Sequence, residues 1–313
     1  MTIDHKFIDQ FVNITSKAAV ASYNLIGKKD KIAADKATVD SMRNNLNQLN
    51  IKGKIVIGEG ELDEAPMLYI GEEVGTRNGP EIDIAVDPLE GTNFAANNLP
   101  GALSVIAIAE KNNLFNAPET YMEKISANVN EKGVVDLDYS TKENIFNLCE
   151  YLNKKPESIT ACIMDRPRHK DIIDELNILG VKVKLITDGD VSGALLVTDD
   201  KYGVDIFLGI GGGPEGVLAA AALDTFECSF QGRFLFHTEK DKRSAKRMGI
   251  TNLSKKYELN EIVKGDTIFC ATGITSGDLV SGIRTKNNEF ITETLVTHKS
   301  TGLKKIIKKV ENR

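Results

Sequence analysis

Residues 82–92, Ile-Asp-Ile-Ala-Val-Asp-Pro-Leu-Glu-Gly-Thr, combine side chains that could bind both a metal ion and a phosphate. The apolar, β-branched run predicts a buried strand that carries Asp87 to its carboxyl end. Pro88 has no N–H to donate and is expected to end the strand, so that Glu90 returns to the same point from the turn. The glycine that follows and Thr92 open a predicted helix whose free N–H groups attract anions. Carboxylates beside such a helix end are suitable ligands for Mg²⁺ or Mn²⁺.

Other acidic side chains lie in comparable positions, after a predicted strand or on a nearby helix. These candidates are Asp35, one turn after Lys31 on a predicted helix, and Glu59, Asp63, Asp188, Asp190 and Glu215, which follow predicted strands. A single acidic loop is most often only a solvated turn. Several carboxylates at one edge of an α/β sheet, however, would repel one another unless a cation lay between them. A divalent metal cluster is therefore the simpler interpretation.

The glycine-rich residues 209–216, Gly-Ile-Gly-Gly-Gly-Pro-Glu-Gly, contain the pattern G-x-G-x-x-G between a predicted strand and a predicted helix. A dinucleotide-binding fold is therefore an alternative. Pro214 and Glu215 would nevertheless place a ring and a negative charge where the pyrophosphate must lie. We interpret the glycines as allowing backbone N–H groups to approach a phosphate or a sugar hydroxyl, with Glu215 facing a metal.

Residues 165–170, Asp-Arg-Pro-Arg-His-Lys, place positive charges at the start of another predicted helix. The amino end of a helix is the unfavourable end for a cation, so an anion nearby would account for Arg166 and Arg168. The planar fork of arginine suits a phosphate group. A solvated basic turn is an equally weighted alternative, and His169 alone is not predicted to be catalytic.

The composition excludes several classes of protein. The 313 residues carry a formal net charge of −6, which argues against nucleic-acid binding, and the four scattered cysteines form no Cys-x-x-Cys pair. The amino terminus contains Asp4 and Asp9 and no apolar signal region, and the apolar stretch 102–109 is far too short to cross a bilayer. We therefore expect a cytoplasmic protein with no membrane partner.

Periodicity and turn residues predict the order of the elements. Helices are expected over 7–25 and 30–50, and strands over 54–58, 82–87 and 102–109. From residue 141 onward strands and helices alternate, which predicts a parallel or mixed sheet covered by helices on both faces. We place a domain boundary near residue 155, dividing the chain into a metal-binding subdomain, 1–155, and an α/β subdomain completing the substrate site, 156–313. The basic tail 303–310 is predicted to be an amphipathic packing helix.

Together these residues resemble the class II fructose-1,6-bisphosphatases, part of the lithium-sensitive, metal-dependent sugar-phosphatase superfamily that includes inositol monophosphatase. The superfamily signature Asp-Pro-hydrophobic-Asp-Gly-Thr matches residues 87–92 with one departure, because Glu90 replaces the second aspartate, as in the class II form. Further matching segments are 31–35, 58–67, 188–190, 211–216 and 272–275.

The resemblance implies a fold, a metal site and a substrate site. The fold is α/β, a layered α/β/α/β/α sandwich of two subdomains, assembled as homodimers or tetramers. Two or more ions, Mn²⁺ or Mg²⁺, would be held by Asp35 and Glu59 and by Asp87, Glu90 and Glu215. The residues implied around the sugar bisphosphate are Glu90, Gly91, Thr92, Tyr121, Arg166, Pro167, Arg168, Asp188, Gly189, Asp190 and Gly212. The implied catalytic residues are Thr92, Asp63 and Lys31.

The implied activity is metal-dependent hydrolysis of the 1-phosphate of fructose 1,6-bisphosphate, a gluconeogenic step. Thr92 could orient the attacking water, deprotonate it or attack directly; we favour water orientation because no adjacent base is identifiable. Sedoheptulose 1,7-bisphosphate or another sugar or inositol phosphate is the alternative substrate. Two other classes stay open: an NAD(P)-dependent oxidoreductase, and a non-catalytic regulator that binds a sugar phosphate without releasing phosphate.

Overall fold

The computed structural model describes residues 3–58, 68–116 and 118–313. The chain forms two compact units, one of Met1–Asn116 with Val263–Arg313 and one of Ala117–Ile262. This division differs from the predicted boundary near residue 155. The cause is long-range strand pairing, because the carboxyl-terminal strands join the sheet of the amino-terminal unit. Such pairing leaves no signal in local sequence patterns.

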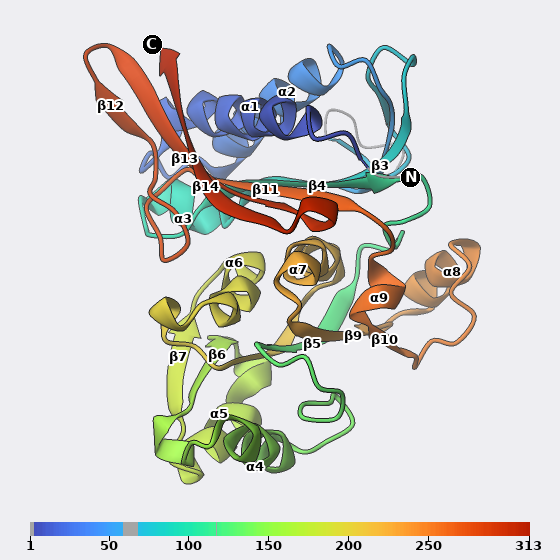
Figure 1. Cartoon of the computed structure of the whole chain (residues 1–313), viewed down its shortest axis with the longest axis vertical. Coiled ribbons are helices and arrows are strands. Elements are labelled where there is room, and N and C mark those ends of the chain that lie inside the picture. The colour runs from blue at the N-terminus through green and yellow to red at the C-terminus, as the bar shows by residue number, and fades with distance from the viewer. Residues whose placement is uncertain (1–2, 59–67, 117) are drawn as a thin grey trace. The chain divides into compact units, whose positions relative to one another are not determined.

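In its described residues the first unit contains an eight-stranded sheet in the order β12-β13-β11-β4-β3-β1-β2, with β14 paired to β13. Its strands are β1 (Lys52–Ile57), β2 (Glu73–Val74), β3 (Glu81–Glu90), β4 (Leu103–Glu110), β11 (Thr267–Gly273), β12 (Arg284–Lys286), β13 (Glu289–His298) and β14 (Leu303–Asn312). Its helices are α1 (Phe7–Ala21), α2 (Lys31–Leu46) and the short α3 (Thr92–Asn97). α1 and α2 cover one face of the sheet (Figure 1), and the core between them includes Phe11, Met42 and Ile84.

β3 lies between β1 and β4 and extends further than predicted. Pro88 does not end the strand, which continues to Glu90. Instead the register with β4 shifts between Asp87 and Glu90, as in a β-bulge, where the missing N–H of proline disrupts no regular ladder. Gly91 then adopts a left-handed conformation (φ 75°) and caps α3, so the predicted helix start at Thr92 is confirmed.

The prediction of a carboxyl-terminal helix is wrong, because residues 303–312 form β14. β14 pairs antiparallel with β13 along its whole length, from Leu303 opposite His298 to Asn312 opposite Glu289. Leu303 and Ile307 pack against the core of the first unit, whereas Ile306 is 43% exposed. The lysines that suggested a solvated helix face instead line an edge strand, where they discourage pairing with other chains.

The described part of the second unit forms a six-stranded sheet in the order β10-β9-β5-β8-β6-β7. Its strands are β5 (Tyr121–Ala127), β6 (Thr160–Met164), β7 (Lys182–Ile186), β8 (Ile206–Gly212), β9 (Ser229–Leu235) and β10 (Lys256–Glu258). Its helices are α4 (Thr141–Leu152), α5 (Lys170–Ile178), α6 (Asp190–Leu195), α7 (Gly213–Phe226), α8 (Glu239–Arg247) and α9 (Leu259–Ile262).

Helices cover both faces of this second sheet, with α4 and α5 on one side and α6 and α7 on the other (Figure 1). Two adjacent residues of β5 point to opposite faces of the sheet. Ile125 belongs to the core that contains Leu148 of α4 and Leu176 of α5. Ser126, on the opposite face, donates its hydroxyl to the Ala194 carbonyl of α6 at 3.2 Å. The predicted α/β class, with a mixed sheet between two helix layers, is therefore confirmed.

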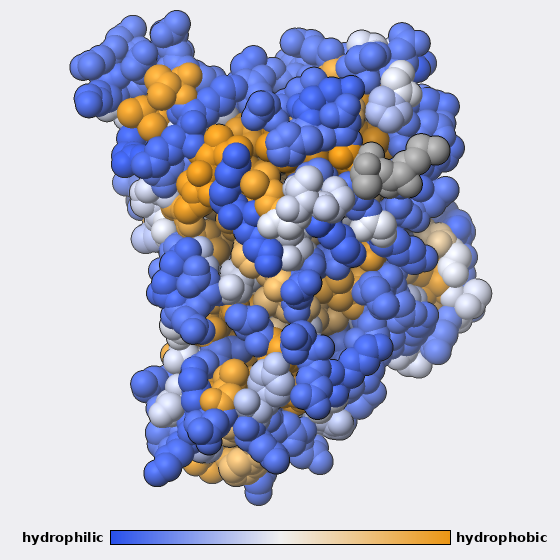
Figure 2. Space-filling model, in the orientation of Figure 1, coloured by the Kyte–Doolittle hydropathy of each residue, from blue (hydrophilic) through white to orange (hydrophobic). Residues whose placement is uncertain are grey.

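The face drawn in Figure 2 is mostly hydrophilic, with several apolar patches between the hydrophilic residues. No helix within the described residues is both long enough and apolar enough to cross a membrane.

Candidate active site

The first unit brings together the acidic residues of β3 and the start of α3. One carboxylate oxygen of Asp87 and one of Glu90 lie within 4.8 Å of each other. The bulge makes this possible, because in a regular strand residues three apart point to opposite faces. Glu90 is 3% exposed, and Thr92 is half-buried as the first residue of α3. Two carboxylates this close repel each other unless a cation or proton intervenes.

α2 carries two further candidates at its beginning. Its cap is Asp30, whose Oδ1 accepts the Ala33 N–H at 2.9 Å, and this fixes the turn that bears Lys31 and Asp35. α2 packs against β3 and α3, and therefore Asp35 belongs to the same part of the first unit as Asp87. Lys31 is exposed and Asp35 is half-buried. Glu59 and Asp63, the remaining candidates of this unit, lie outside the described residues.

The substrate candidates of the second unit gather at one edge of its sheet. β6, β7 and β8 run parallel, so their carboxyl ends meet at this edge. Residues 165–168 follow β6 and residues 187–190 follow β7. The glycine-rich segment, residues 209–216, forms the end of β8 and the start of α7. Tyr121, the first residue of antiparallel β5, lies opposite Gly212 at the same edge. This topology accounts for why candidates far apart in sequence share one location.

Arg168 and Tyr121 form a pair beside the glycine-rich end of β8. The Arg168 guanidinium donates to the Ile210 carbonyl from Nε at 3.0 Å and from Nη2 at 2.7 Å. The same group lies over the Tyr121 ring, 5.0 Å from its centre. Both side chains are exposed, which leaves them able to contact a ligand. Arg166 donates to the carbonyl of its neighbour Asp165 at 3.0 Å and is not part of this pair.

His169 connects the ends of β6 and β8 inside the protein. Its Nδ1 donates to the Met164 carbonyl at 2.7 Å, and its Nε2 accepts the Ile210 N–H at 2.8 Å, so the ring is neutral. Burial is the main reason why the pKa of His169 is lowered, and the nearby Arg168 charge acts in the same direction. Its position in the interior agrees with the expectation that His169 is not a catalytic base.

Lys124 is a residue of this region that the sequence did not reveal. It is 1% exposed in the middle of β5, and its ammonium bonds the Asp190 carboxylate and the Gly212 carbonyl, the latter at 2.7 Å. Asp190 is itself only 5% exposed. The sequence signal is a lysine between Glu123 and Ile125 in a short strand, which is weak because its partner is 66 residues away.

The glycines where β8 passes into α7 lie close to the protein's own side chains. A Cβ at Gly211 would lie 1.8 Å from Asp190 Oδ2, and one at Gly212 would lie 1.9 Å from Glu215 Oε2. A Cβ at Gly213 would lie 2.8 Å from the Phe234 ring. A side chain at any of the three positions would force its neighbours to shift. Gly211 and Gly212 thus accommodate carboxylates, and this reason for a glycine is independent of the predicted approach of backbone to a phosphate.

Glu215 lies at the start of α7 with its carboxylate folded back over Gly212. Its buried Oε2 accepts no hydrogen bond from any residue that the structure describes. Burial first, and next the Asp190 carboxylate, raise the pKa of Glu215 to about 7, although Lys124 acts in the opposite direction. A buried carboxylate oxygen without a donor is the kind of ligand that a divalent cation would complete.

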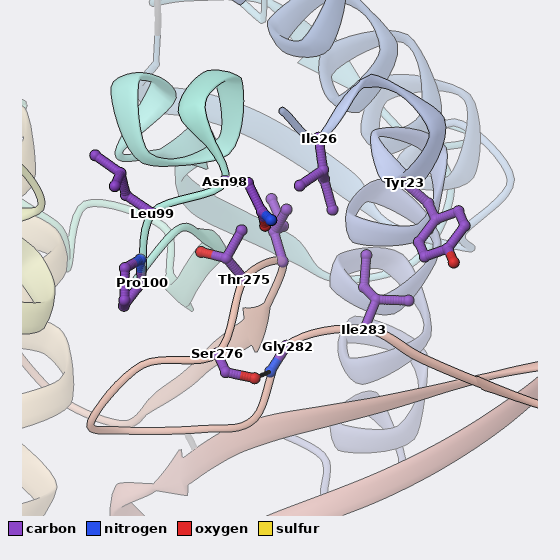
Figure 3. A pocket seen from close by; sticks show the side chains of 10 residues that line it. Tyr23, Ile26, Asn98, Leu99, Pro100, Thr275, Ser276, Gly282 and Ile283 are labelled. Atoms are coloured by element: carbon purple, nitrogen blue, oxygen red, sulfur yellow. Dashed lines mark hydrogen bonds between the residues drawn. The ribbon is translucent and has the colours of Figure 1, made fainter. Parts of the chain in front are cut away.

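A separate cavity of about 470 Å³ lies in the first unit, near the far end of α3 (Figure 3). Ile26, Tyr23 and Ile283 form one side of it, and Asn98, Leu99 and Pro100 lie on the other. Among the residues that the structure describes, no acidic or basic side chain and no predicted site residue lines it. This cavity is therefore distinct from the candidate active site.

The first unit holds a pair of close carboxylates at the end of a strand, and the second holds an exposed arginine at the carboxyl edge of its sheet. Both are components that metal-dependent phosphoryl-transfer enzymes use. Residues 5–311 match the family described as bacterial fructose-1,6-bisphosphatase, glpX-encoded, and the chain belongs to this family.

Individual relatives agree with this assignment. Fructose-1,6-bisphosphatase 1 class 2 of Escherichia coli (strain K12) is 44% identical over 300 residues, covering 92% of this chain and 89% of that protein. D-fructose 1,6-bisphosphatase class 2/sedoheptulose 1,7-bisphosphatase of Synechococcus sp. (strain JA-3-3Ab) is 42% identical over 319 residues, covering 94% of this chain and 92% of that protein. Among solved structures, an IMPase of Thermotoga maritima is similar with a TM-score of 0.34 at 14% identity, over 64% of this chain and 79% of that one.

Proposed function

We propose that this protein hydrolyses the 1-phosphate of fructose 1,6-bisphosphate to give fructose 6-phosphate and phosphate, with sedoheptulose 1,7-bisphosphate as a second substrate. The observation that carries the proposal is the close Asp87–Glu90 pair directly before Thr92, in a chain that belongs to the bacterial fructose-1,6-bisphosphatase family. The relatives named for both substrates support the wider range. Phosphate monoester hydrolysis is extremely slow without a catalyst, so charge neutralisation and positioning must supply most of the acceleration.

The described acidic residues fit a site for Mn²⁺ or Mg²⁺. Asp87 and Glu90 offer two oxygens within 4.8 Å, and Glu215 offers a buried oxygen without a donor. Asp35, and Glu59 from outside the described residues, complete the proposed set of ligands. When bound, a divalent cation supplies charge neutralisation for the phosphoryl oxygens and favours ionisation of water. The identity and number of the ions belong to the proposal.

The residues of the second unit are proposed to hold the sugar bisphosphate. Arg168 has a charged and exposed guanidinium whose position is fixed by the Ile210 carbonyl and the Tyr121 ring. We assign Arg168 and Arg166 to the distal phosphate, where they affect binding more than turnover. Pro167, Asp188, Gly189, Asp190 and Gly212 are assigned to the surrounding surface, and Glu90 and Gly91 to the phosphate that is cleaved.

The reacting water is assigned to Thr92, assisted by Asp63 and Lys31. The Thr92 hydroxyl stands at the start of α3, one residue after the left-handed Gly91. It can accept a hydrogen bond from a water molecule while donating its own to another acceptor. Asp63 is the proposed acceptor of the proton that the water loses. Lys31, exposed at the start of α2, is assigned to stabilise negative charge.

Phosphate release from fructose 1,6-bisphosphate by the purified chain tests this function. We expect release with Mn²⁺ or Mg²⁺ and none with EDTA, and the same dependence with sedoheptulose 1,7-bisphosphate. Absence of release with either metal would contradict the proposal. An NAD(P)-dependent oxidoreductase would instead show a higher melting temperature with a dinucleotide and not with Mn²⁺. The G-x-G-x-x-G pattern supports that class less, because Gly211 and Gly212 accommodate Asp190 and Glu215. A non-catalytic regulator would bind the sugar phosphate in EDTA and release nothing.

The proposal also includes a cytoplasmic location and a homo-oligomer, either a dimer or a tetramer. Light scattering on the purified chain measures the mass of the assembly directly. A monomer at micromolar concentration would contradict the oligomer.

A further inference from the structure

Two carboxylates of the second unit lie against the two glycines that end β8 but have different partners. Asp190 Oδ2 approaches Gly211 and accepts a hydrogen bond from Lys124, whereas Glu215 Oε2 approaches Gly212. In the part of the chain that the structure describes, Glu215 Oε2 has no hydrogen-bond partner. One of two adjacent carboxylates is thus neutralised by the protein, and the other is left for a ligand.

The position of Lys124 is strongly determined by the sheet around it. Its register partners on the two neighbouring strands are both glycines, Gly209 of β8 and Gly232 of β9. A Cβ at Gly216 of α7 would lie 3.2 Å from Lys124 Cδ, so the aliphatic part of the lysine runs closely past that helix. Its ammonium then reaches Asp190 and the Gly212 carbonyl. A buried lysine is rare unless it is paired. Here the pairing sets the positions of the Asp190 carboxylate and of the Gly212 carbonyl at the end of β8.

We propose that Lys124 is a positioning residue of the active site, which holds the Asp190 carboxylate away from the divalent cation and leaves Glu215 as the metal ligand of this region. This inference rests on the proposed function, because it assigns a cation to Glu215. Without the ammonium, Asp190 becomes a second free anionic ligand beside Glu215. The cation then binds more tightly but to a different set of ligands, and Asp190 is lost to the substrate.

Mn²⁺ binding to the full chain without substrate, measured from the electron paramagnetic resonance signal of free Mn²⁺, tests the role of Lys124. In Lys124→Met we expect the Kd for Mn²⁺ to fall by about tenfold, since one positive charge has been removed close to the ion. We expect kcat/KM for fructose 1,6-bisphosphate to fall in the same variant. Asp190→Asn leaves the ammonium without its carboxylate and should raise the Kd by a similar factor. The double variant should restore the wild-type Kd while kcat/KM stays low.

The opposite signs of the two single variants separate positioning from a merely structural role. Lys256→Met is the control, because this ammonium too is paired with acidic side chains, Asp136 and Asp138, elsewhere in the same unit. It should leave both the Kd and kcat/KM within about twofold of wild type. Should Lys124→Met not fold, Asp190→Asn and the double variant, which buries no unpaired charge, decide the question.

Unchanged Mn²⁺ affinity in Asp190→Asn or Lys124→Met would overturn the inference, as would wild-type protein that binds no Mn²⁺. Wild-type protein that binds Mn²⁺ but releases no phosphate would instead contradict the proposed function. In that case the Kd values of the variants still decide the role of Lys124.

Discussion

Thr92 is the side chain on which the proposed hydrolysis depends most directly. The bulge in β3 turns Glu90 toward Asp87, and the left-handed Gly91 then directs the chain into α3 at Thr92. The bulge and the left-handed glycine therefore set the position of Thr92 at the start of α3. A group held in this way can orient a water molecule without losing much conformational freedom in the transition state.

Replacing Thr92 by valine keeps the shape of the side chain and removes the hydroxyl. We expect kcat to fall by about 10²- to 10³-fold with KM changed by less than about threefold, because the group acts in the transition state and not in substrate binding. Steady-state phosphate release measures both constants. Thr92→Ser keeps the hydroxyl and should retain most of the activity. Turnover of Thr92→Val near that of wild type would exclude the role.

At the scale of elements, His169 shows how two parallel strands are held in register beyond their ends. Direct pairing between β6 and β8 is limited to Ala161 with Ile206 and Cys162 with Phe207. Further along, the imidazole connects Met164 to Ile210 through its two nitrogens. Since Ile210 also accepts from Arg168, the histidine stabilises the backbone on which the proposed phosphate ligand rests.

The lowered pKa of His169 predicts a specific dependence of stability on pH. A histidine whose native pKa lies below its unfolded value of about 6.5 contributes its full stabilisation above that value, and the contribution is lost as pH falls through the native pKa. Protonation would place a second N–H against the Ile210 N–H. Urea unfolding at pH 8 and pH 5 should therefore show a larger loss of stability in wild type than in His169→Gln. An equal loss in both proteins would refute this origin.

β14 gives an element-scale test of the strand that replaced the predicted helix. Ile307 packs against the core and Ile306 is 43% exposed, as expected for adjacent residues on opposite faces of a strand. Ile307→Asp should lower the free energy of unfolding by about 2–4 kcal/mol, and Ile306→Asp by less than about 1 kcal/mol. Thermal or urea unfolding of the two variants measures the difference. Equal effects would contradict the strand.

At the scale of the whole molecule, the sequence predicted best where the determinants are local. α4 begins at residue 141, where the alternation of strands and helices is predicted to start, because Ser140 and Glu143 form a capping box there. The alternation of strands and helices after residue 156 follows from short apolar runs separated by glycine and proline. The acids at strand ends were found because they follow those runs directly.

Long-range pairing is what the sequence could not show. β11 lies between β4 and β13, so its partner β4 is more than 150 residues away along the chain. Nothing in the run 303–310 distinguishes an edge strand from an amphipathic helix until β13 is known to lie beside it. Lys124 is a similar case, because a lysine in a strand becomes informative only when Asp190 and Gly212 are found around it.

The division of the chain into units leads to a prediction about fragments. Residues 117–262 contain a complete six-stranded sheet with its own core, so this fragment should fold alone with a cooperative thermal transition. Residues 156–313, the unit expected from the sequence, contain β11, β13 and β14 without β4, and β8 and β9 without β5 between them. Both of its sheets would expose unpaired edges and apolar faces, so we expect no cooperative transition. Circular dichroism during heating compares the two fragments. Cooperative melting of 156–313 but not of 117–262 would show that the chain is divided near residue 155, as the sequence predicted.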